Sequence, residues 1–551
     1  QASLWFESCV AAQAQILEVI AWSLMGQLFA LALWRTRRFS VVALLLVGTS
    51  MFLGFWLFAP LGAWLSAWGR VLHYYFLAGP LAWFCLGGVS SVFLGTYRRV
   101  HFRFKGLAPF CLVGLTLCLT PFVLSGLMSP SPSGKNIVLI SIDALSAKHL
   151  KAYGYPRETA PNITSFASKS LVFQDAYSHS SWTLPSHASM FTGLEPVHHG
   201  ASTEESILEK RYHTLAEVLR NAGYKTAAFV DGFSGFFLDD ARGFAQGFDL
   251  YDQEGGGSEK IVPKVLSWLT MQHEPYFLFV HLYDVHLDYD PDAQSRRLFV
   301  DPDYQGKVDG YWTTLTDLGC DMHPKQDTKC PLGEKDKQHL VDLYDAEIYN
   351  LDKNMAPLLS KLKQSTDALD TVVFFTADHG SEFFEHDGFN HNQLYEESLR
   401  VPLVVRGLGH TVPARKERII WGADVFPSAL DIAQQPWKQD IDGVSFFADL
   451  REERIVTFSD VHTFGLRFGP WKILCPQEEH LQGARTPECQ LFNIEEDPGE
   501  LEDQWKRKAT ISESMLLLLK AKFFGDKAQT SPKIALDEAA LERLRALGYL
   551  R

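Results

Sequence analysis

Two short apolar runs in this sequence end in side chains that bind metal ions. The run Asn136–Ile142 leads into Asp143. A second run, Thr371–Ala377, leads into Asp378 and His379. Buried parallel strands have this apolar composition, and their C-terminal side chains meet at one edge of a sheet. Because carboxylate and imidazole groups are ligands for divalent cations, the two run ends predict a metal site at that edge.

A hydroxyl group, that of Thr183, lies between the two runs, after Ser178–Trp182 and before a helix-like segment. A hydroxyl at a helix start would lie beside free backbone N–H groups, which can hold an anion over the oxygen. Taken alone, the segment also suits a helix capped by Thr183 with Pro185 in its first turn. The ligand-type residues elsewhere favour the chemical interpretation, in which Thr183 is a nucleophile at the metal site.

A third apolar run, Tyr276–Val280, is followed at once by polar residues. This tip carries His281, Asp284 and His286. For His281 we expect a satisfied structural histidine and not a metal ligand. Strand-like and helix-like segments alternate from residue 137 onward, which predicts a mostly parallel sheet flanked by helices.

From residue 136 to about residue 503, the chain resembles the sulfatase branch of the alkaline phosphatase superfamily. The resemblance rests on motifs in family order: NIVLISIDAL, APNI, TLPSHASMFTG, FVHLYDVH, TADHGSEFFEHDGFNH, LYEESLRVPLVV, DVFPSALDIA, DGVSF and LFNIEEDPGE. It implies that Asp143, Asp378 and His379 are metal ligands, and that Thr183 is both a ligand and the nucleophile. It also implies an α/β fold with a small C-terminal antiparallel subdomain.

The nucleophile motif departs from that of the sulfatases. They carry CxPxR or SxPxR, whose first residue is oxidised to formylglycine, whereas Thr183–His187 reads TLPSH. Threonine cannot form that aldehyde. The motif is similar to that of nucleotide pyrophosphatase/phosphodiesterases, and threonine is also the nucleophile of membrane phosphoethanolamine and phosphoglycerol transferases. The resemblance therefore implies phosphoryl transfer. Ala144 and His379 replace oxygen ligands that sulfatases tend to have, which favours Zn²⁺ or Mn²⁺ over Ca²⁺.

Further site residues follow from the same resemblance. His286 matches a histidine that binds the anionic group of the substrate. His187 occupies the position of the sulfatase arginine, where it would bind a substrate oxygen or protonate the leaving group. His391 lies near the position where relatives place a Lys or His facing the substrate. In two-metal relatives an Asp and two His residues hold a second ion, a set that Asp284, His286 and His391 would supply.

The first quarter of the 551-residue chain differs in composition from the remainder. Residues 1–134 carry eight Lys/Arg and two Glu, a net charge of +6, which leaves −20 of the total of −14 for the remaining residues. Four apolar stretches are long enough to cross a bilayer. They are Val10–Trp34, Phe39–Pro60, Val71–Tyr97 and Gly106–Met128. We therefore predict a four-helix transmembrane domain at residues 1–128.

The basic residues between these stretches predict the orientation of the protein. Arginines at 35, 37 and 38 lie between the first two stretches, and a second basic group lies between the last two. The positive-inside rule places both groups in the cytoplasm and the part after Met128 outside. We expect a multi-pass protein of a bacterial inner membrane with a periplasmic or extracellular catalytic domain. The acidic remainder does not suggest nucleic-acid binding.

The domain boundaries follow from these segments. We predict a linker at residues 129–135, a catalytic domain at 136–423, and a C-terminal subdomain with a tail helix at 424–551. Residues 301–333 are predicted to be an insertion over the site. In an oxidising compartment, the close pairs Cys320/Cys330 and Cys475/Cys489 predict two disulfides.

Three functions remain open at this point. The leading hypothesis is a membrane transferase that moves a phosphoethanolamine or phosphoglycerol headgroup, through a phosphothreonine, to an envelope glycan or lipid. The first alternative is a sulfatase-like hydrolase or phosphodiesterase. The second is a non-catalytic subunit of an envelope complex, against which the presence of Asp143, Thr183, Asp378 and His379 argues. The sequence does not indicate the oligomeric state.

Overall fold

The fold described below is that of a computed structural model. It describes residues 134–525, without 203–205, 232–236, 321–329, 369, 392, 410–414, 417, 438–439, 449–453, 461 and 478–487. The four predicted transmembrane stretches and the predicted tail helix lie outside these residues. Within the described part of the chain, no helix combines the length and the apolar character that a membrane span requires.

The described residues contain a central sheet of eight strands in the order β11-β2-β10-β7-β1-β6-β4-β5. The strands are β1 (Asn136–Ile142), β2 (Leu171–Phe173), β4 (Lys225–Val230), β5 (Leu250–Asp252), β6 (Tyr276–Leu282), β7 (Thr371–Ala377), β10 (Leu403–Arg406) and β11 (Arg415–Lys416). The five strands from β7 to β5 run parallel, and β10 is antiparallel to both of its neighbours. The predicted mostly parallel α/β fold is confirmed.

The register of the central strands explains how the site is assembled. Ile142, the last residue of β1, pairs with Leu282 of β6 on one side and with Ala377 of β7 on the other. All three strands are buried on both faces, apart from the first residue of β1, as expected for the centre of a parallel sheet. The residues that directly follow these strands therefore leave the sheet side by side.

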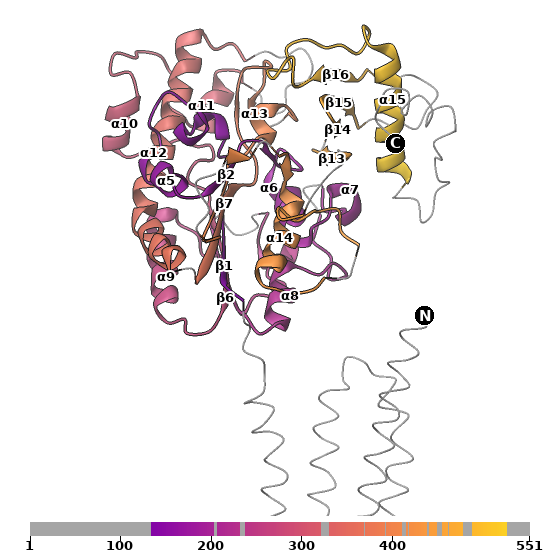
Figure 1. Cartoon of the computed structure of the whole chain (residues 1–551). Helices are drawn as coiled ribbons and strands as arrows, with labels where there is room; N and C mark the ends of the chain where they lie inside the picture. The colour runs from indigo at the N-terminus through magenta and orange to yellow at the C-terminus, as the bar shows by residue number, and fades with distance from the viewer. Residues whose placement is uncertain are drawn as a thin grey trace, which may run out of the picture. The chain divides into compact units, whose positions relative to one another are not determined.

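Helices cover both faces of this sheet (Figure 1). On one face lie α5 (Pro161–Ala167), α9 (Ser258–Thr270) and the 34-residue α12 (Glu334–Asp367). On the other face lie α6 (Thr183–Thr192), α8 (Leu215–Asn221) and α14 (Val425–Ile432). Shorter elements include α7 (Pro196–His199), α10 (Ala293–Phe299), α11 (Trp312–Asp317), α13 (Glu396–Leu399), β8 (Glu382–Phe383) and β9 (Phe389–Asn390). A single large hydrophobic cluster joins the sheet to these layers.

A second sheet follows in the C-terminal part of the chain. It is antiparallel and contains β13 (Val456–Ser459), β14 (Thr463–Phe468), β15 (Trp471–Pro476) and β16 (Gln490–Asn493). The helix α15 (Ala509–Lys520) packs against it and closes a separate hydrophobic cluster (Figure 1). Val425, Phe426 and Phe446 fall within the predicted C-terminal subdomain, which begins at residue 424. Their side chains nevertheless pack in the hydrophobic cluster of the main sheet. β3 (Ala176–Tyr177) pairs in parallel with β12 (Ile420–Trp421), and the two form a separate two-stranded sheet.

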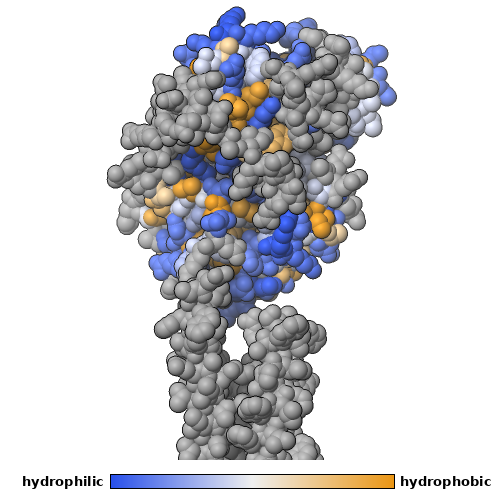
Figure 2. All heavy atoms as spheres, turned by 90° about the vertical axis from the view of Figure 1, so that its right-hand side faces the viewer, coloured by the Kyte–Doolittle hydropathy of each residue, from blue (hydrophilic) through white to orange (hydrophobic). Residues whose placement is uncertain are grey.

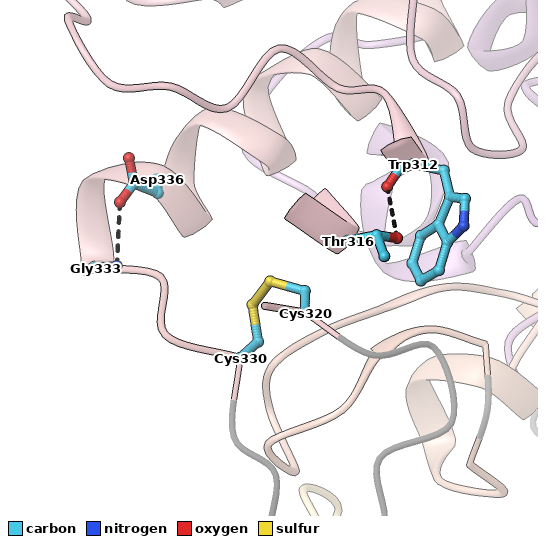
Figure 3. The surroundings of a disulfide bond; sticks show 6 residues. All are labelled: Trp312, Thr316, Cys320, Cys330, Gly333 and Asp336. Atoms are coloured by element: carbon cyan, nitrogen blue, oxygen red, sulfur yellow. Dashed lines mark hydrogen bonds between the residues drawn. A yellow bond between two sulfur atoms is a disulfide. The ribbon is translucent and has the colours of Figure 1, made fainter. Parts of the chain in front are cut away.

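Both predicted disulfides are present, Cys320–Cys330 and Cys475–Cys489. Figure 3 shows the first, which links the region after α11 to the segment before α12. Thr316 donates to the Trp312 carbonyl, and Gly333 N–H donates to Asp336 at the start of α12. The first of these bonds is internal to α11, and the second caps the start of α12 at the end of the predicted insertion.

The surface of the described residues is mostly hydrophilic on the face shown in Figure 2. Hydrophobic residues form small groups between hydrophilic ones there. Scattered apolar side chains of this kind are ordinary for a protein surface.

Candidate active site

Asp143, Asp378 and His379 come together at the carboxyl ends of β1 and β7. All three are fully buried, and one ligand atom from each lies within 4.8 Å of the other two. Nε2 of His379 is 3.4 Å from Asp143 Oδ1 and 3.6 Å from Asp378 Oδ2. These three atoms have no hydrogen-bond partner. Buried polar atoms without partners are costly, and a bound cation would satisfy all three at once.

The tautomer of His379 also suits a metal ligand. Its Nδ1 lies 2.9 Å from the Gly380 carbonyl oxygen, which can only accept, so Nδ1 carries the proton and Nε2 presents a lone pair to the carboxylates. Burial lowers the pKa of His379 to about 4, so the ring is neutral at neutral pH. The residues present fit a divalent cation.

The two carboxylates of this cluster have different surroundings. Burial and the charge of Asp143 raise the pKa of Asp378 well above its usual range. Burial acts in the same direction on Asp143, but a hydrogen bond from His281 and the positive charge of neighbouring histidine, chiefly at His286, outweigh it, so its pKa is lowered. Two buried acids that interact this strongly are typical of an ion-binding site.

The turn after β1 orients Asp378. Its Oδ1 accepts the backbone N–H groups of His379 (2.9 Å) and Ala144 (3.3 Å). Ala144 adopts a φ of 57°, which is uncommon for a residue with a Cβ. The Tyr344 hydroxyl from α12 donates to the Ala144 carbonyl at 2.6 Å and accepts the Ser146 N–H at 2.9 Å. Through Tyr344, α12 thus supports the turn that holds the carboxylate of Asp378, the residue directly after β7.

Thr183 begins α6, and the structure places it beside the cluster of Asp143, Asp378 and His379. Its Oγ1 donates to Asp143 Oδ2 at 3.2 Å, and the residue is only 3% exposed. The capping interpretation is wrong, because Trp182 is the N-cap and Thr183 is the first helical residue. The hydroxyl therefore lies beside the carboxylates, at the end of the helix where N–H groups lack partners within the helix.

His187 does not lie where a substrate-binding or proton-donating residue would lie. It is fully buried, with Nδ1 2.9 Å from the Thr183 carbonyl oxygen and Nε2 3.0 Å from Ser141 Oγ. Burial lowers its pKa well below the usual range, so the ring is neutral. Nδ1–H then donates to Thr183, and the Ser141 hydroxyl donates to Nε2. This prediction is corrected: His187 uses both ring nitrogens to position the first turn of α6.

We expect His187→Ala to lower kcat by about 10²-fold with little change in KM, because a small displacement of a nucleophile is enough for such a loss. Ser141→Ala should destabilise the protein by about 1–3 kcal/mol, since Nε2 loses its donor. Ser141→Thr keeps the hydroxyl and serves as the control. Steady-state kinetics and thermal unfolding check both effects. A rise in KM with unchanged kcat would show that His187 contacts the substrate after all.

His281 belongs to the site, which the sequence analysis did not foresee. The strand β6 continues through His281 instead of ending before it, and His281 pairs with Ser141 of β1. Its Nε2 is 3.3 Å from Asp143 Oδ2, and its Nδ1 is 3.3 Å from the Asp231 carbonyl oxygen. With His187 and Asp378 it forms a second group of close ligand-type atoms. The sequence did hold a signal for this role: Ser141 and His281 are polar residues near the ends of two otherwise apolar runs, and the two runs pair in the sheet.

His286 and His391 form a pair beside the cluster of Asp143, Asp378 and His379. Their Nε2 atoms are 3.1 Å apart, and the rings of His391 and His379 are 4.3 Å apart. Each Nδ1 lies close to a carbonyl oxygen, Leu287 at 2.6 Å and Ser181 at 2.8 Å, and so carries a proton. If both rings were neutral, the two Nε2 atoms would point their lone pairs at each other. A contact of 3.1 Å is favourable only when one of them carries a proton. Burial and the neighbouring histidines lower the pKa of His391 well below its usual range.

The predicted second metal set does not form as a set of three. The carboxylate of Asp284 accepts Ser258 N–H at 3.0 Å and the Ser258 hydroxyl, at the first residue of α9. The N–H groups at the start of a helix have no partner within the helix and need such an acceptor, which explains why the Asp284 carboxylate faces α9. Among the described residues, Asp284 belongs to no group of ligand atoms with His286 and His391. Only the two histidines come together.

Comparisons with known proteins agree with this fold. Residues 135–435 match the family model Sulfatase. An arylsulfatase of Clostridium perfringens is 24% identical over 435 residues, covering 66% of this chain and 89% of that protein. Arylsulfatase A of Bos taurus is 26% identical over 490 residues, covering 75% and 92%.

Solved structures resemble the chain in fold. The phosphonate monoester hydrolase of Agrobacterium radiobacter has a TM-score of 0.57 at 18% identity, covering 71% of this chain and 96% of that one. A protein solved in complex with its substrate D-glucosamine-2-N,6-O-disulfate has a TM-score of 0.59 at 18% identity, covering 72% and 99%.

Proposed function

The chain belongs to the sulfatase family, and we propose that it is a metal-dependent hydrolase of phosphate or phosphonate esters with Thr183 as its nucleophile. The observation that carries this proposal is the Thr183 hydroxyl, 3.2 Å from Asp143 Oδ2 in a buried cluster of ligand atoms. The similar proteins include both arylsulfatases and a phosphonate monoester hydrolase.

The chemistry of threonine favours phosphorus over sulfur. A formylglycine hydrate has a second hydroxyl on the same carbon, which can expel a bound sulfate without attack at sulfur. A threonine ester has no such group, so water or an alcohol must attack the bound phosphorus or sulfur atom directly. Phosphoryl groups undergo in-line displacement of this kind at metal sites.

Asp143, Asp378 and His379 would hold the ion, with Thr183 as a further ligand. Zn²⁺ or Mn²⁺ is proposed over Ca²⁺ because the set includes an imidazole. When bound, the ion would lower the pKa of the Thr183 hydroxyl and stabilise charge on a phosphoryl oxygen.

The residues of the chain then account for two displacement steps. Thr183 Oγ1 attacks phosphorus while its proton moves towards Asp143 Oδ2, the acceptor of its hydrogen bond. The bond from phosphorus to the leaving oxygen breaks, and the proton shared by His286 and His391 passes to that oxygen. A phosphothreonine remains. In the second step an acceptor oxygen loses its proton to the histidine pair and attacks phosphorus. The bond from phosphorus to Thr183 Oγ1 breaks, and Oγ1 takes back its proton from Asp143.

A direct test compares ester classes on the metal-loaded protein. We expect release of p-nitrophenol from bis-p-nitrophenyl phosphate or a phosphonate monoester, and a phosphoryl adduct on Thr183 in a rapidly quenched sample analysed by intact mass. p-Nitrophenyl sulfate should react far more slowly. Preferential hydrolysis of the sulfate ester, or an adduct that persists in Thr183→Ala, would contradict the proposal.

A second candidate is the transferase, in which an alcohol replaces water as acceptor. The four apolar stretches of residues 1–128 and the short linker that follows them favour it, because they would keep the catalytic domain near a membrane surface. The donor would be a lipid with a phosphoethanolamine or phosphoglycerol headgroup and the acceptor an envelope glycan or lipid, outside the cytoplasm. An adduct with the mass of such a headgroup after incubation with envelope lipids would favour transfer. Turnover in water alone favours hydrolysis.

A further inference from the structure

A second cluster of ligand-type side chains lies outside the candidate active site. It contains His386, Glu397 and Glu500, and one ligand atom of each lies within 4.8 Å of the other two. His386 comes from the loop between β8 and β9, Glu397 from α13, and Glu500 from the turn after β16. Three segments, one of them from the C-terminal subdomain, thus place an imidazole and two carboxylates at one point.

Two atoms of this cluster lack hydrogen-bond partners although they are buried. These are Nε2 of His386 and Oε2 of Glu397, whose side chains are 10% and 3% exposed. They are 3.6 Å apart, which is too long for a hydrogen bond. The corresponding separations in the active-site cluster are 3.4 and 3.6 Å. The spacing and the missing partners are therefore those of a place for a cation.

Neighbouring groups orient both carboxylates towards the cluster. Lys148 pairs with Oε1 of Glu397 and leaves Oε2 for His386. Lys472 lies 2.8 Å from Glu500 Oε1, and the Glu396 N–H donates to Glu500 Oε2 at 2.7 Å. Ligands of metal ions are held by outer hydrogen bonds of this kind.

The backbone and the side-chain packing add to this orientation. Glu500 adopts a left-handed φ of 53°, a conformation that is unfavourable for a residue with a Cβ. The ring of His386 stacks on Tyr395, with ring centroids 3.6 Å apart. Packing against Tyr395 therefore holds the ring of His386 in place.

We propose that His386, Glu397 and Glu500 bind a structural divalent cation, of the Zn²⁺ or Mn²⁺ class, distinct from the ion of the candidate active site. One imidazole and two carboxylates suit these ions better than Mg²⁺ or Ca²⁺. The ion would fasten the turn after β16 to α13. The Ser398 carbonyl in α13 accepts the Gly380 N–H at 2.7 Å, next to His379, so the ion would also support the catalytic loop.

The test measures bound metal in the full chain, stripped with a chelator and reloaded with Zn²⁺ alone. We expect His386→Gln and Glu500→Gln each to lose about one equivalent of zinc per chain relative to the unchanged protein, together with part of the zinc-dependent rise in Tm. The matched control is Glu496→Gln, an exposed glutamate of the same segment, which should lose none. Asp143→Asn should lose the active-site ion but keep this one.

A second measurement removes the ambiguity of a misfolded variant. In the Asp143→Asn background, loading with Co²⁺ should give a ligand-field spectrum that disappears when Glu500→Gln, an isosteric change, is added. The Co²⁺ spectrum is the readout here, because Glu500→Gln also removes the charge that pairs with buried Lys472 and so changes the stability of the metal-free protein. Equal zinc content in the unchanged protein, His386→Gln and Glu500→Gln would overturn the proposal.

Discussion

Thr183→Ala is expected to lower kcat by on the order of 10⁴-fold or more, because it removes the atom that forms the covalent bond to the substrate. The hydroxyl at the start of α6 donates to Asp143 at 3.2 Å. Among the described residues, the nearby hydroxyls of Ser178 and Ser186 bond to each other at 2.7 Å, so they do not replace it. Turnover of a phosphate diester and the mass of the trapped intermediate check this result.

Thr183→Ser is the matched control for this prediction. Serine keeps the hydroxyl but loses the methyl group that restricts χ1, so a loss of only about tenfold is expected. Its phosphoryl adduct should have a mass lower by one methylene group. If Thr183→Ala kept its turnover while both variants bound metal normally, another nucleophile or direct attack by water would have to be considered in place of Thr183.

Removal of the active-site ion is the second change with a large expected effect. We expect Asp378→Asn to lower kcat by on the order of 10³-fold or more, since it removes a ligand and with it the stabilisation of charge on the phosphoryl group. The asparagine oxygen can still accept the N–H groups of Ala144 and His379 that now bond to Oδ1. The fold should therefore persist.

Thermal unfolding separates the loss of the ion from damage to the fold. Without metal, Asp378→Asn should be at least as stable as the unchanged protein, because one of two buried carboxylates in contact has been neutralised. With Zn²⁺, only the unchanged protein should gain the stabilisation that the active-site ion provides. For the unchanged protein stripped of metal, we expect Zn²⁺ or Mn²⁺ to restore turnover and Ca²⁺ to restore little. Full recovery with Ca²⁺ alone would refute the assignment of the ion.

The sequence by itself determined the strands and the residues at their ends. The runs before Asp143 and Asp378 are apolar on both faces, and such runs form the centre of a parallel sheet. The start of a helix near Thr183 is likewise a local property, visible in Pro185 and in the residues that precede it. Local patterns of this kind correctly predicted the α/β fold, the two disulfides and the meeting of Asp143, Thr183, Asp378 and His379.

The tertiary structure alone decided what the other polar side chains do. His187 contacts Ser141 from β1, Asp284 contacts Ser258 from α9, and His281 contacts Asp143, each across a large gap in sequence. The cluster of His386, Glu397 and Glu500 likewise joins segments that no local pattern connects. A side chain's role depends on the partners that the packing places beside it, and periodicity along one segment holds no information about those partners.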